Sequence, residues 1–336
     1  MKHKVCLLMI SLSILSSCKN AQVETKSDTD RKIEVYDKEL LSIIDSTATI
    51  EVLADGFTWS EGPLYLGNKK MLLFTDVPEN TIYAWDETNG KAIYLKPSGY
   101  NDTLAGGGTE GANGLALDQD GKLILCQHGN RVVARMESSL DKPQANFTYL
   151  TKAFYSKKFS SPNDLHICKN GDIIFTDPPY GLPDQDQDKR KELKYNGVYL
   201  LKKDGSISLM DSTLTRPNGV ALSTDEKYMY VANSDKAKSI WIKYELDSFK
   251  NIVDRSQFAD VTHLTETQKG LPDGLKINKK GYIFATGPGG VLVFSPDSRH
   301  LGTINTGQAT ANCALDDTET YLYMTAHSYL MRVRLK

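Results

Sequence analysis

The sequence has few of the features that mark several common classes of protein. Its net charge of −2 and the absence of a basic block argue against nucleic acid as a partner. Only 5 cysteines occur in 336 residues, and none has the spacing of zinc ligands. Three of them, Cys126, Cys168 and Cys313, lie in apolar runs and are expected to be buried, inert thiols. Thiolate metal chemistry and a disulfide framework are therefore not expected.

Helical periodicity is also scarce. Between positions 50 and 336, no window longer than about three helical turns carries a convincing apolar stripe, and residues 262–269 are the only short candidate. The chain instead alternates β-branched and aromatic runs with turn sequences such as 118–121 and 278–281. The sequence is therefore predicted to be all-β.

Residues 1–17 are predicted to be a signal peptide. Two lysines precede an apolar run over 5–15, which is too short to span a bilayer, and small residues then precede Cys18. The stretch from Leu15 to Cys18 is similar to a bacterial lipoprotein box, so we expect Cys18 to be acylated; an ordinary cleaved signal is the alternative. Acylation would make the lipid anchor the only membrane contact and place the protein in the bacterial cell envelope, either periplasmic or attached to the outer membrane.

The remaining chain is predicted to form one domain. Residues 18–45 are assigned to a tether and lead-in, because the stretch from 19 to about 35 is polar and lacks periodicity. Residues 46–336 are assigned to the folded domain.

A short phrase recurs through this domain, each time with an amide or carboxylate at the same place. Clear copies contain Asn113, Asn163, Asn218 and Asp273, each followed by Gly or Asp and then by an apolar run; looser copies contain Glu61 and Asn312. We call these six residues the anchors, and they are separated by 52, 50, 55, 55 and 39 positions. Repeats of this length with several strands each are typical of a propeller, in which no blade buries its faces alone. The prediction is a six-bladed β-propeller. A pair of β-sandwich domains is the alternative, but it gives no reason for anchors at an even pitch.

In a propeller the anchors would begin the innermost strands and meet at one mouth of the channel. Glu61, Asn163, Asn218 and Asp273 then form a set of hard oxygen ligands suited to Ca²⁺ or Mg²⁺, with positions left for water or substrate. The alternative for each asparagine is a purely structural turn, since Asn tolerates left-handed backbone angles. Glu61 and Asp273 at equivalent positions favour the metal site, because a glutamate gains nothing in a tight turn.

The repeated phrases also resemble a known family. Ser-Glu61-Gly-Pro, Gly-Ala-Asn113-Gly-Leu, Ser-Pro-Asn163-Asp, Arg-Pro-Asn218-Gly-Val and Pro-Asp273-Gly look like the gluconolactonase family, which includes regucalcin (senescence marker protein) and is distantly similar to paraoxonases. The stretches from Cys126 to Arg131 and from Phe175 to Leu182 add to the resemblance. It covers the chain from about residue 50 to the end, and it implies a six-bladed propeller that binds a divalent cation and hydrolyses lactones.

The resemblance also implies roles for individual residues. Glu61, Asn218 and Asp273 match the core metal ligands, Asp273 matches the proton acceptor and donor, and Asn163 matches a residue that contacts substrate and, in some members, the metal. One departure is Ser161, which stands where regucalcin-like members have an arginine. Other groups must therefore form the hydrogen bonds to the substrate hydroxyls.

Further residues are predicted near the same mouth. Asn113, His128 and Arg131 are expected to contact substrate together with Asn163, and Asp164 is expected to orient a ligand from behind. The alternative for Asn113, His128 and Arg131 is a role in stabilising loops between blades. The charged segment 183–196 is either a lid or a solvated surface loop.

The sequence therefore predicts a metal-dependent lactonase that opens sugar lactones, with one divalent cation polarising the carbonyl and Asp273 as general base and acid. Calcium is the first expectation, and magnesium, manganese and zinc stay open. No Gly-x-Ser-x-Gly elbow is present to support a serine nucleophile. The alternatives are a broader lactonase or esterase of paraoxonase-like type and a non-catalytic binding propeller.

Overall fold

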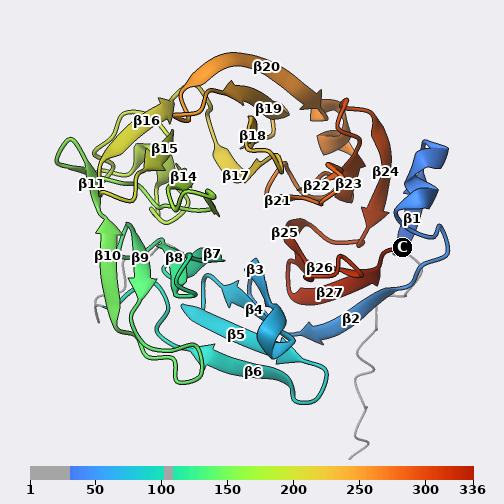
Figure 1. Cartoon of the computed structure of the whole chain (residues 1–336), viewed down its shortest axis with the longest axis horizontal. Coiled ribbons are helices and arrows are strands. Elements are labelled where there is room, and N and C mark those ends of the chain that lie inside the picture. The colour runs from blue at the N-terminus through green and yellow to red at the C-terminus, as the bar shows by residue number, and fades with distance from the viewer. Residues whose placement is uncertain (1–30, 102–108) are drawn as a thin grey trace, which may run out of the picture.

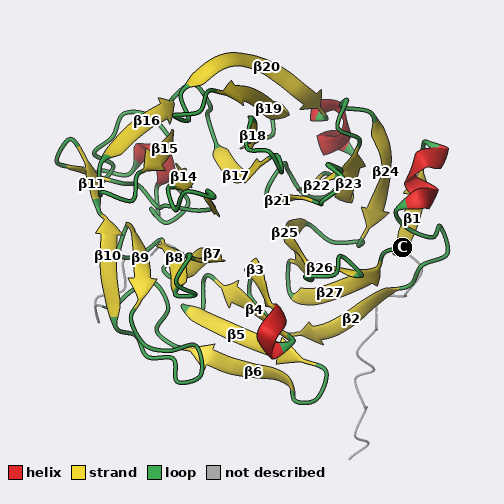
Figure 2. Cartoon of the chain, in the orientation of Figure 1, coloured by secondary structure: helices red, strands yellow, loops and turns green. Residues whose placement is uncertain are grey.

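The chain forms six β-sheets arranged around a central axis (Figure 1). The structure is a computed structural model that describes residues 31–101 and 109–336. The predicted all-β, six-bladed propeller is confirmed. The helices within the described ranges are short 3-10 turns, drawn red in Figure 2: η2 (Lys38–Ser42), η3 (Gly67–Lys69), η4 (Gln185–Gln187) and η5 (Thr262–Glu266). The short helix expected at 262–269 corresponds to η5. Within the described residues, no helix is long and apolar enough to cross a membrane.

The blades follow one another along the chain, each with its innermost strand first. Blade 1 consists of β3 (Ser60–Leu66), β4 (Met71–Asp76), β5 (Thr81–Asp86) and β6 (Gly90–Leu95). Blade 2 consists of β7 (Ala112–Leu117), β8 (Leu123–Gln127), β9 (Val132–Met136) and β10 (Phe147–Thr151). A small hairpin of β11 (Ala153–Phe154) and β12 (Lys157–Lys158) follows it.

The next two blades repeat this pattern. Blade 3 consists of β13 (Leu165–Ile167), β14 (Ile173–Asp177), β15 (Gly197–Leu201) and β16 (Ile207–Asp211). Blade 4 consists of β17 (Pro217–Leu222), β18 (Tyr228–Asp235), β19 (Lys238–Leu246) and β20 (Ile252–Asp260).

The last two blades take up strands from the beginning of the chain. Blade 5 consists of β21 (Leu275–Ile277), β22 (Ile283–Gly287), β23 (Gly290–Phe294) and β24 (His300–Asn305), with β1 (Lys32–Val35) added at its outer edge. Blade 6 consists of β25 (Thr310–Leu315), β26 (Tyr321–Ala326) and β27 (Tyr329–Arg334), and its outer strand is β2 (Ile50–Asp55). Antiparallel pairing of β2 with β27 closes the ring without leaving β27 as an open edge.

The core lies between blades, because each sheet is apolar on the faces that meet its neighbours. The cluster between blades 6 and 1, for example, combines Phe74 and Trp85 with Tyr323 and Leu330. The three cysteines are free and buried in such layers, as predicted. Burial of both faces explains why the middle strands read as continuous apolar runs.

The glycines that follow Glu61 and Asn218 have a steric reason. A Cβ on Gly62 would lie 1.9 Å from the carbonyl oxygen of Asn113, and one on Gly219 would lie 2.2 Å from that of Asp273. In both cases the backbone carbonyl of one anchor lies against the glycine that follows the anchor of the preceding blade. Only glycine permits this approach at Gly62 and Gly219, so these copies of the phrase encode the close packing of the inner strands.

The lead-in to the propeller is already packed from residue 32 onward. β1 pairs with β24, and η2 places Leu40 and Ile44 in the cluster between blades 5 and 6. The predicted signal peptide 1–17, the acylation of Cys18 and the first part of the tether lie outside the described residues.

Truncation of Leu40 tests whether this lead-in belongs to the folded domain. Leu40 is 0% exposed, so Leu40→Ala is expected to lower the free energy of unfolding by about 2–4 kcal/mol, through lost burial and a residual cavity. Urea unfolding followed by fluorescence measures the change. Leu41 is the matched control, since it is 37% exposed and Leu41→Ala should cost less than about 1 kcal/mol. Equal effects of the two variants would show that η2 does not contribute to the core.

Candidate active site

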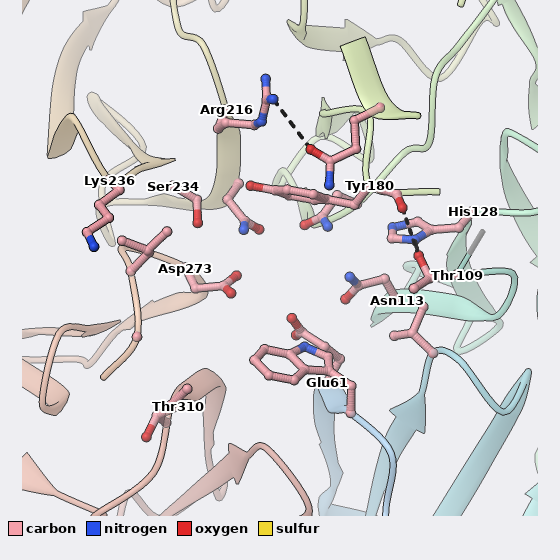
Figure 3. Close-up of a pocket in the computed structure, with 18 of the residues that line it drawn as sticks. Glu61, Thr109, Asn113, His128, Tyr180, Arg216, Ser234, Lys236, Asp273 and Thr310 are labelled. Atoms are coloured by element: carbon pink, nitrogen blue, oxygen red, sulfur yellow. Dashed lines mark hydrogen bonds between the residues drawn. The ribbon is translucent and has the colours of Figure 1, made fainter. Parts of the chain in front are cut away.

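Five of the six anchors meet in one cavity on the propeller axis. The cavity has a volume of about 690 Å³, within the range of small-molecule sites. Glu61, Asn113, Asn163, Asn218 and Asp273 all line it, and Figure 3 shows the side chains of Glu61, Asn113 and Asp273 directed into it from three sides. The predicted convergence of residues far apart in the sequence is therefore present.

The inner strands place these side chains by a shared irregularity. The pairing register shifts just after Glu61 in β3, after Ala112 in β7 and after Pro217 in β17. A bulge at this point redirects a side chain, here toward the axis. Asn163 and Asp273 lie in the turns immediately before β13 and β21. Asn312, the sixth anchor, is buried outside the cavity lining and contacts Glu61.

Two carboxylates share this site with no basic residue paired to either of them among the described contacts. Burial and the nearby charge of Asp164 raise the pKa of Glu61 to about 7, although hydrogen bonds from Gly62, Trp59 and Asn312 offset part of the effect. Burial and the charges of Glu61 and Asp164 also raise the pKa of Asp273 well above its usual range. The site is therefore short of positive charge.

Several buried polar atoms around these carboxylates have no hydrogen-bond partner in the described structure: Asn113 Oδ1, Asp164 Oδ2, Asp273 Oδ1 and His128 Nε2. Unsatisfied buried acceptors are costly, so such a group calls for a ligand. Within the described ranges, no cluster of three His, Cys, Asp or Glu side chains is close enough to form a metal site by itself. The donor set is instead two carboxylates with amide oxygens, which fits a hard divalent cation.

Asp164 lies behind the cavity rather than in its lining. Its Oδ1 accepts a hydrogen bond from the amide of Leu165 at 2.9 Å, and its charge acts on both Glu61 and Asp273. The residue is 4% exposed. Asp164 therefore acts on the two cavity carboxylates from outside the lining, and its role in orienting a ligand stays a prediction.

His128 lines the cavity as a neutral imidazole. The Thr109 hydroxyl donates its proton to the carbonyl oxygen of Tyr180 at 3.0 Å, so the contact between Thr109 and Nδ1 of His128 at 3.2 Å requires Nδ1 to be the donor. Nε2 is then an acceptor, and it is the atom without a partner. Burial lowers the pKa of His128 to about 4, which keeps the ring neutral at ordinary pH.

His128 lies one residue beyond the strand position that Asp76 and Asp177 hold in their blades. In the strand register, Asp76 lies opposite Ser60 and Gln127 lies opposite Ala112. Asp76 and Asp177 accept hydrogen bonds from the backbone amides that lead into their own inner strands, and so brace those loops. His128 is the residue beyond this brace, where the chain turns toward the axis.

Arg131 does not lie where a substrate contact was expected. It is absent from the cavity lining, and its guanidinium donates to the carbonyl oxygens of Phe159 and Arg190. The loop-stabilising alternative fits these contacts better. Arg131 also has a positive φ of 60°.

The cavity also contains residues that the repeat did not single out. Trp59, Val77, Tyr180 and Ser234 are among them, and Arg216 and Lys236 add positive charge at the wall (Figure 3). Val77 and Ser234 follow the brace positions Asp76 and Asn233, as His128 follows Gln127. Aligning the second strands of the blades residue by residue would therefore have identified Val77 and Ser234.

The charged segment 183–196 forms part of the wall. Gln185, in η4, lines the cavity, and the adjacent Asp186 pairs with Arg216 of the next blade. Asn196 also donates to Asp186 at 3.1 Å. In this structure these contacts hold the segment beside the mouth of the cavity.

Comparison with known proteins agrees with this geometry. Residues 59–328 match the family model described as SMP-30/gluconolactonase/LRE-like region. The chain is 37% identical over 339 aligned positions to a protein named gluconolactonase from Zymomonas mobilis, covering 99% of this chain and 94% of that protein.

Solved structures show the same fold. A gluconolactonase from Xanthomonas campestris superimposes with a TM-score of 0.77 at 28% identity, covering 91% of this chain and 95% of that one. The calcium-binding protein regucalcin from Agrobacterium tumefaciens superimposes with a TM-score of 0.66 at 16% identity, covering 85% and 94%, and this likeness concerns the fold alone. With its repeated anchors gathered in one axial cavity and its match over most of the sequence, the chain belongs to the SMP-30/gluconolactonase/LRE-like family.

Proposed function

We propose that the protein is a metal-dependent hydrolase that opens sugar lactones, as its gluconolactonase relatives are named for doing. The main support is the meeting of Glu61 and Asp273 with the amides of Asn113, Asn163 and Asn218 in one cavity. A binding platform needs no such ring of carboxylates and amides around its axis. The non-catalytic alternative is therefore less favoured.

The residues that would hold the cation are Glu61, Asn163, Asn218 and Asp273. Two carboxylates would balance a divalent charge, and the oxygen-only set suits calcium first, with magnesium, manganese and zinc as the other candidates. When bound, the cation would polarise the lactone carbonyl and stabilise the negative charge that develops on its oxygen.

Asp273 is the proposed general base and acid. As the water oxygen bonds to the carbonyl carbon, the Asp273 carboxylate takes a proton from that water. The bond between the carbonyl carbon and the ring oxygen then breaks, and Asp273 returns the proton to the departing alkoxide. The product is the open hydroxy acid, so one lactone and one water are consumed.

The remaining polar groups would hold the substrate. Nε2 of His128 and Oδ1 of Asn113 are acceptors that lack partners, so each is suited to a hydrogen bond from a sugar hydroxyl. Asn163 is proposed to contact both substrate and cation. Asp164 is proposed to orient this group from behind the cavity.

Replacement of Asp273 tests the proton-transfer role. Asp273→Asn keeps an amide oxygen for the cation but loses the base, so turnover of gluconolactone should fall by about 10²–10⁴-fold. A pH-stat assay with calcium present measures turnover, and calorimetry measures calcium affinity. Asp235→Asn is the control, because the Asp235 carboxylate is occupied by Thr215 and Ala237; its activity should stay within about twofold of wild type. Substantial activity in a folded Asp273→Asn variant would refute the role.

Cation binding should release protons near neutral pH. Without a cation, burial and neighbouring charge raise the pKa of Glu61 to about 7 and that of Asp273 above its usual range, so the pair retains protons that a divalent cation must displace. Calcium affinity should therefore rise as the pH increases through about 7. Titration calorimetry in two buffers of different ionisation enthalpy measures the protons released. Glu61→Gln should reduce their number, and an affinity independent of pH between about 6 and 8 would contradict this arrangement.

We also propose that the signal peptide 1–17 and acylation of Cys18 deliver the protein to the bacterial cell envelope. The support is the lipoprotein-like sequence before Cys18. Labelling cells with a radioactive fatty acid should mark the wild-type protein and leave Cys18→Ser unlabelled. Equal labelling of the two would rule out Cys18 as the modified residue.

A further inference from the structure

The cavity has two unlike walls on opposite sides of the axis. Blade 1 contributes Trp59 and Val77, whereas blade 4 contributes Arg216, Ser234 and Lys236. In a ring of six blades the first and fourth face each other, as Figure 1 shows for β3 and β17. Between these walls lie the carboxylates of Glu61 and Asp273. A ligand on the axis therefore meets an aromatic surface on one side and hydrogen-bond donors on the other.

Trp59 is held in a defined position at this wall. Its backbone amide donates to Oδ1 of Asp76 at 3.0 Å, and its ring packs edge-to-face on His327 of blade 6, with centroids 5.4 Å apart and planes at 77°. The other tryptophans of the chain, Trp85 and Trp241, are 6% and 1% exposed and belong to the core. Trp59 is only half-buried. Its ring thus keeps apolar area open to the cavity, which is available to a ligand.

A sugar ring matches such a pair of walls. One side of the ring presents polarised C–H groups, which are attracted to the negative face of an aromatic ring, while the hydroxyls project from the edges. We propose that Trp59 is the stacking platform for the ring of the lactone substrate and that the hydroxyls face the wall of blade 4. The inference rests on the proposed function, and it names a cyclic polyhydroxylated lactone with a free C–H face as the substrate class.

Trp59 has a second contact that the test must separate from stacking. Its side chain hydrogen-bonds to the Glu61 carboxylate, so Trp59 could act on the cation through Glu61 alone. Phenylalanine at this position keeps an aromatic face but removes the N–H donor. Alanine removes both.

The experiment uses gluconolactam, in which an N–H group replaces the ring oxygen, as a cyclic ligand whose amide bond resists hydrolysis. In the calcium-loaded protein, gluconolactam should produce a saturable change in tryptophan fluorescence. The change should persist in Trp85→Phe, the core control, and disappear in Trp59→Phe. The Michaelis constant for gluconolactone should rise about threefold in Trp59→Phe and about 10- to 50-fold in Trp59→Ala, with kcat changed less than KM. Calcium affinity, from calorimetry, should stay within about threefold of wild type in Trp59→Phe.

Three results would overturn the proposal. The first is an unchanged KM in Trp59→Ala. The second is a fluorescence change that survives in Trp59→Phe and is lost in Trp85→Phe. The third is a loss of calcium affinity that accounts for the whole effect on KM, which would assign Trp59 to Glu61 instead of the substrate. Gluconolactam binding by wild type without lactone turnover would support the platform and refute the hydrolase, so the two claims fail separately.

Discussion

The close approach of the inner strands around the axis is the constraint on which this structure depends. The carbonyl of Asn113 lies against Gly62 and that of Asp273 lies against Gly219, where the missing Cβ leaves room for it. Hydrogen bonds lock the same kind of contact, as between the Gly114 amide and the carbonyl oxygen of Asn163 at 2.8 Å. Because the anchor backbones are fixed against one another, their side chains are held at the axis without the need for a flexible loop. A site built on strands in this way is already organised before a ligand arrives.

This organisation has an electrostatic cost. Glu61 and Asp273 are held together out of water, and the charge of Asp164 acts on both. A fold selected for stability alone would not bury like charges side by side, so the cost indicates a function. A bound divalent cation would offset this electrostatic cost. The raised pKa values of Glu61 and Asp273 are therefore what the proposed cation site would require. The proposed chemistry would therefore use the same carboxylates whose burial costs stability.

The cavity is lined by two kinds of residue: anchors, which the repeats share, and wall residues, which differ from blade to blade. The anchors come from equivalent positions in the blades, whereas the walls come from the turns between strands. Trp59 and Arg216, for example, both line the cavity two residues before their anchors but differ in residue type. Loops carried by a rigid scaffold commonly determine what a site accepts. The choice of lactone is therefore expected to depend on these walls more than on the ring of anchors.

The sequence by itself determined the number of blades, the all-β class and the anchors, because the repeat that specifies inner-strand packing is written in adjacent residues such as Asn218 and Gly219. It placed His128 near the mouth but missed Val77 and Ser234 at the same position in other blades, since pairing between strands is not visible in one strand alone. Only the tertiary structure removed Arg131 from the site, through its contacts with the carbonyl oxygens of Phe159 and Arg190. The tertiary structure alone placed Trp59 across the axis from Lys236 and packed Ile33, Leu40, Ile43 and Ile44 into the core. These outcomes depend on contacts between segments far apart in the chain, which local patterns do not encode.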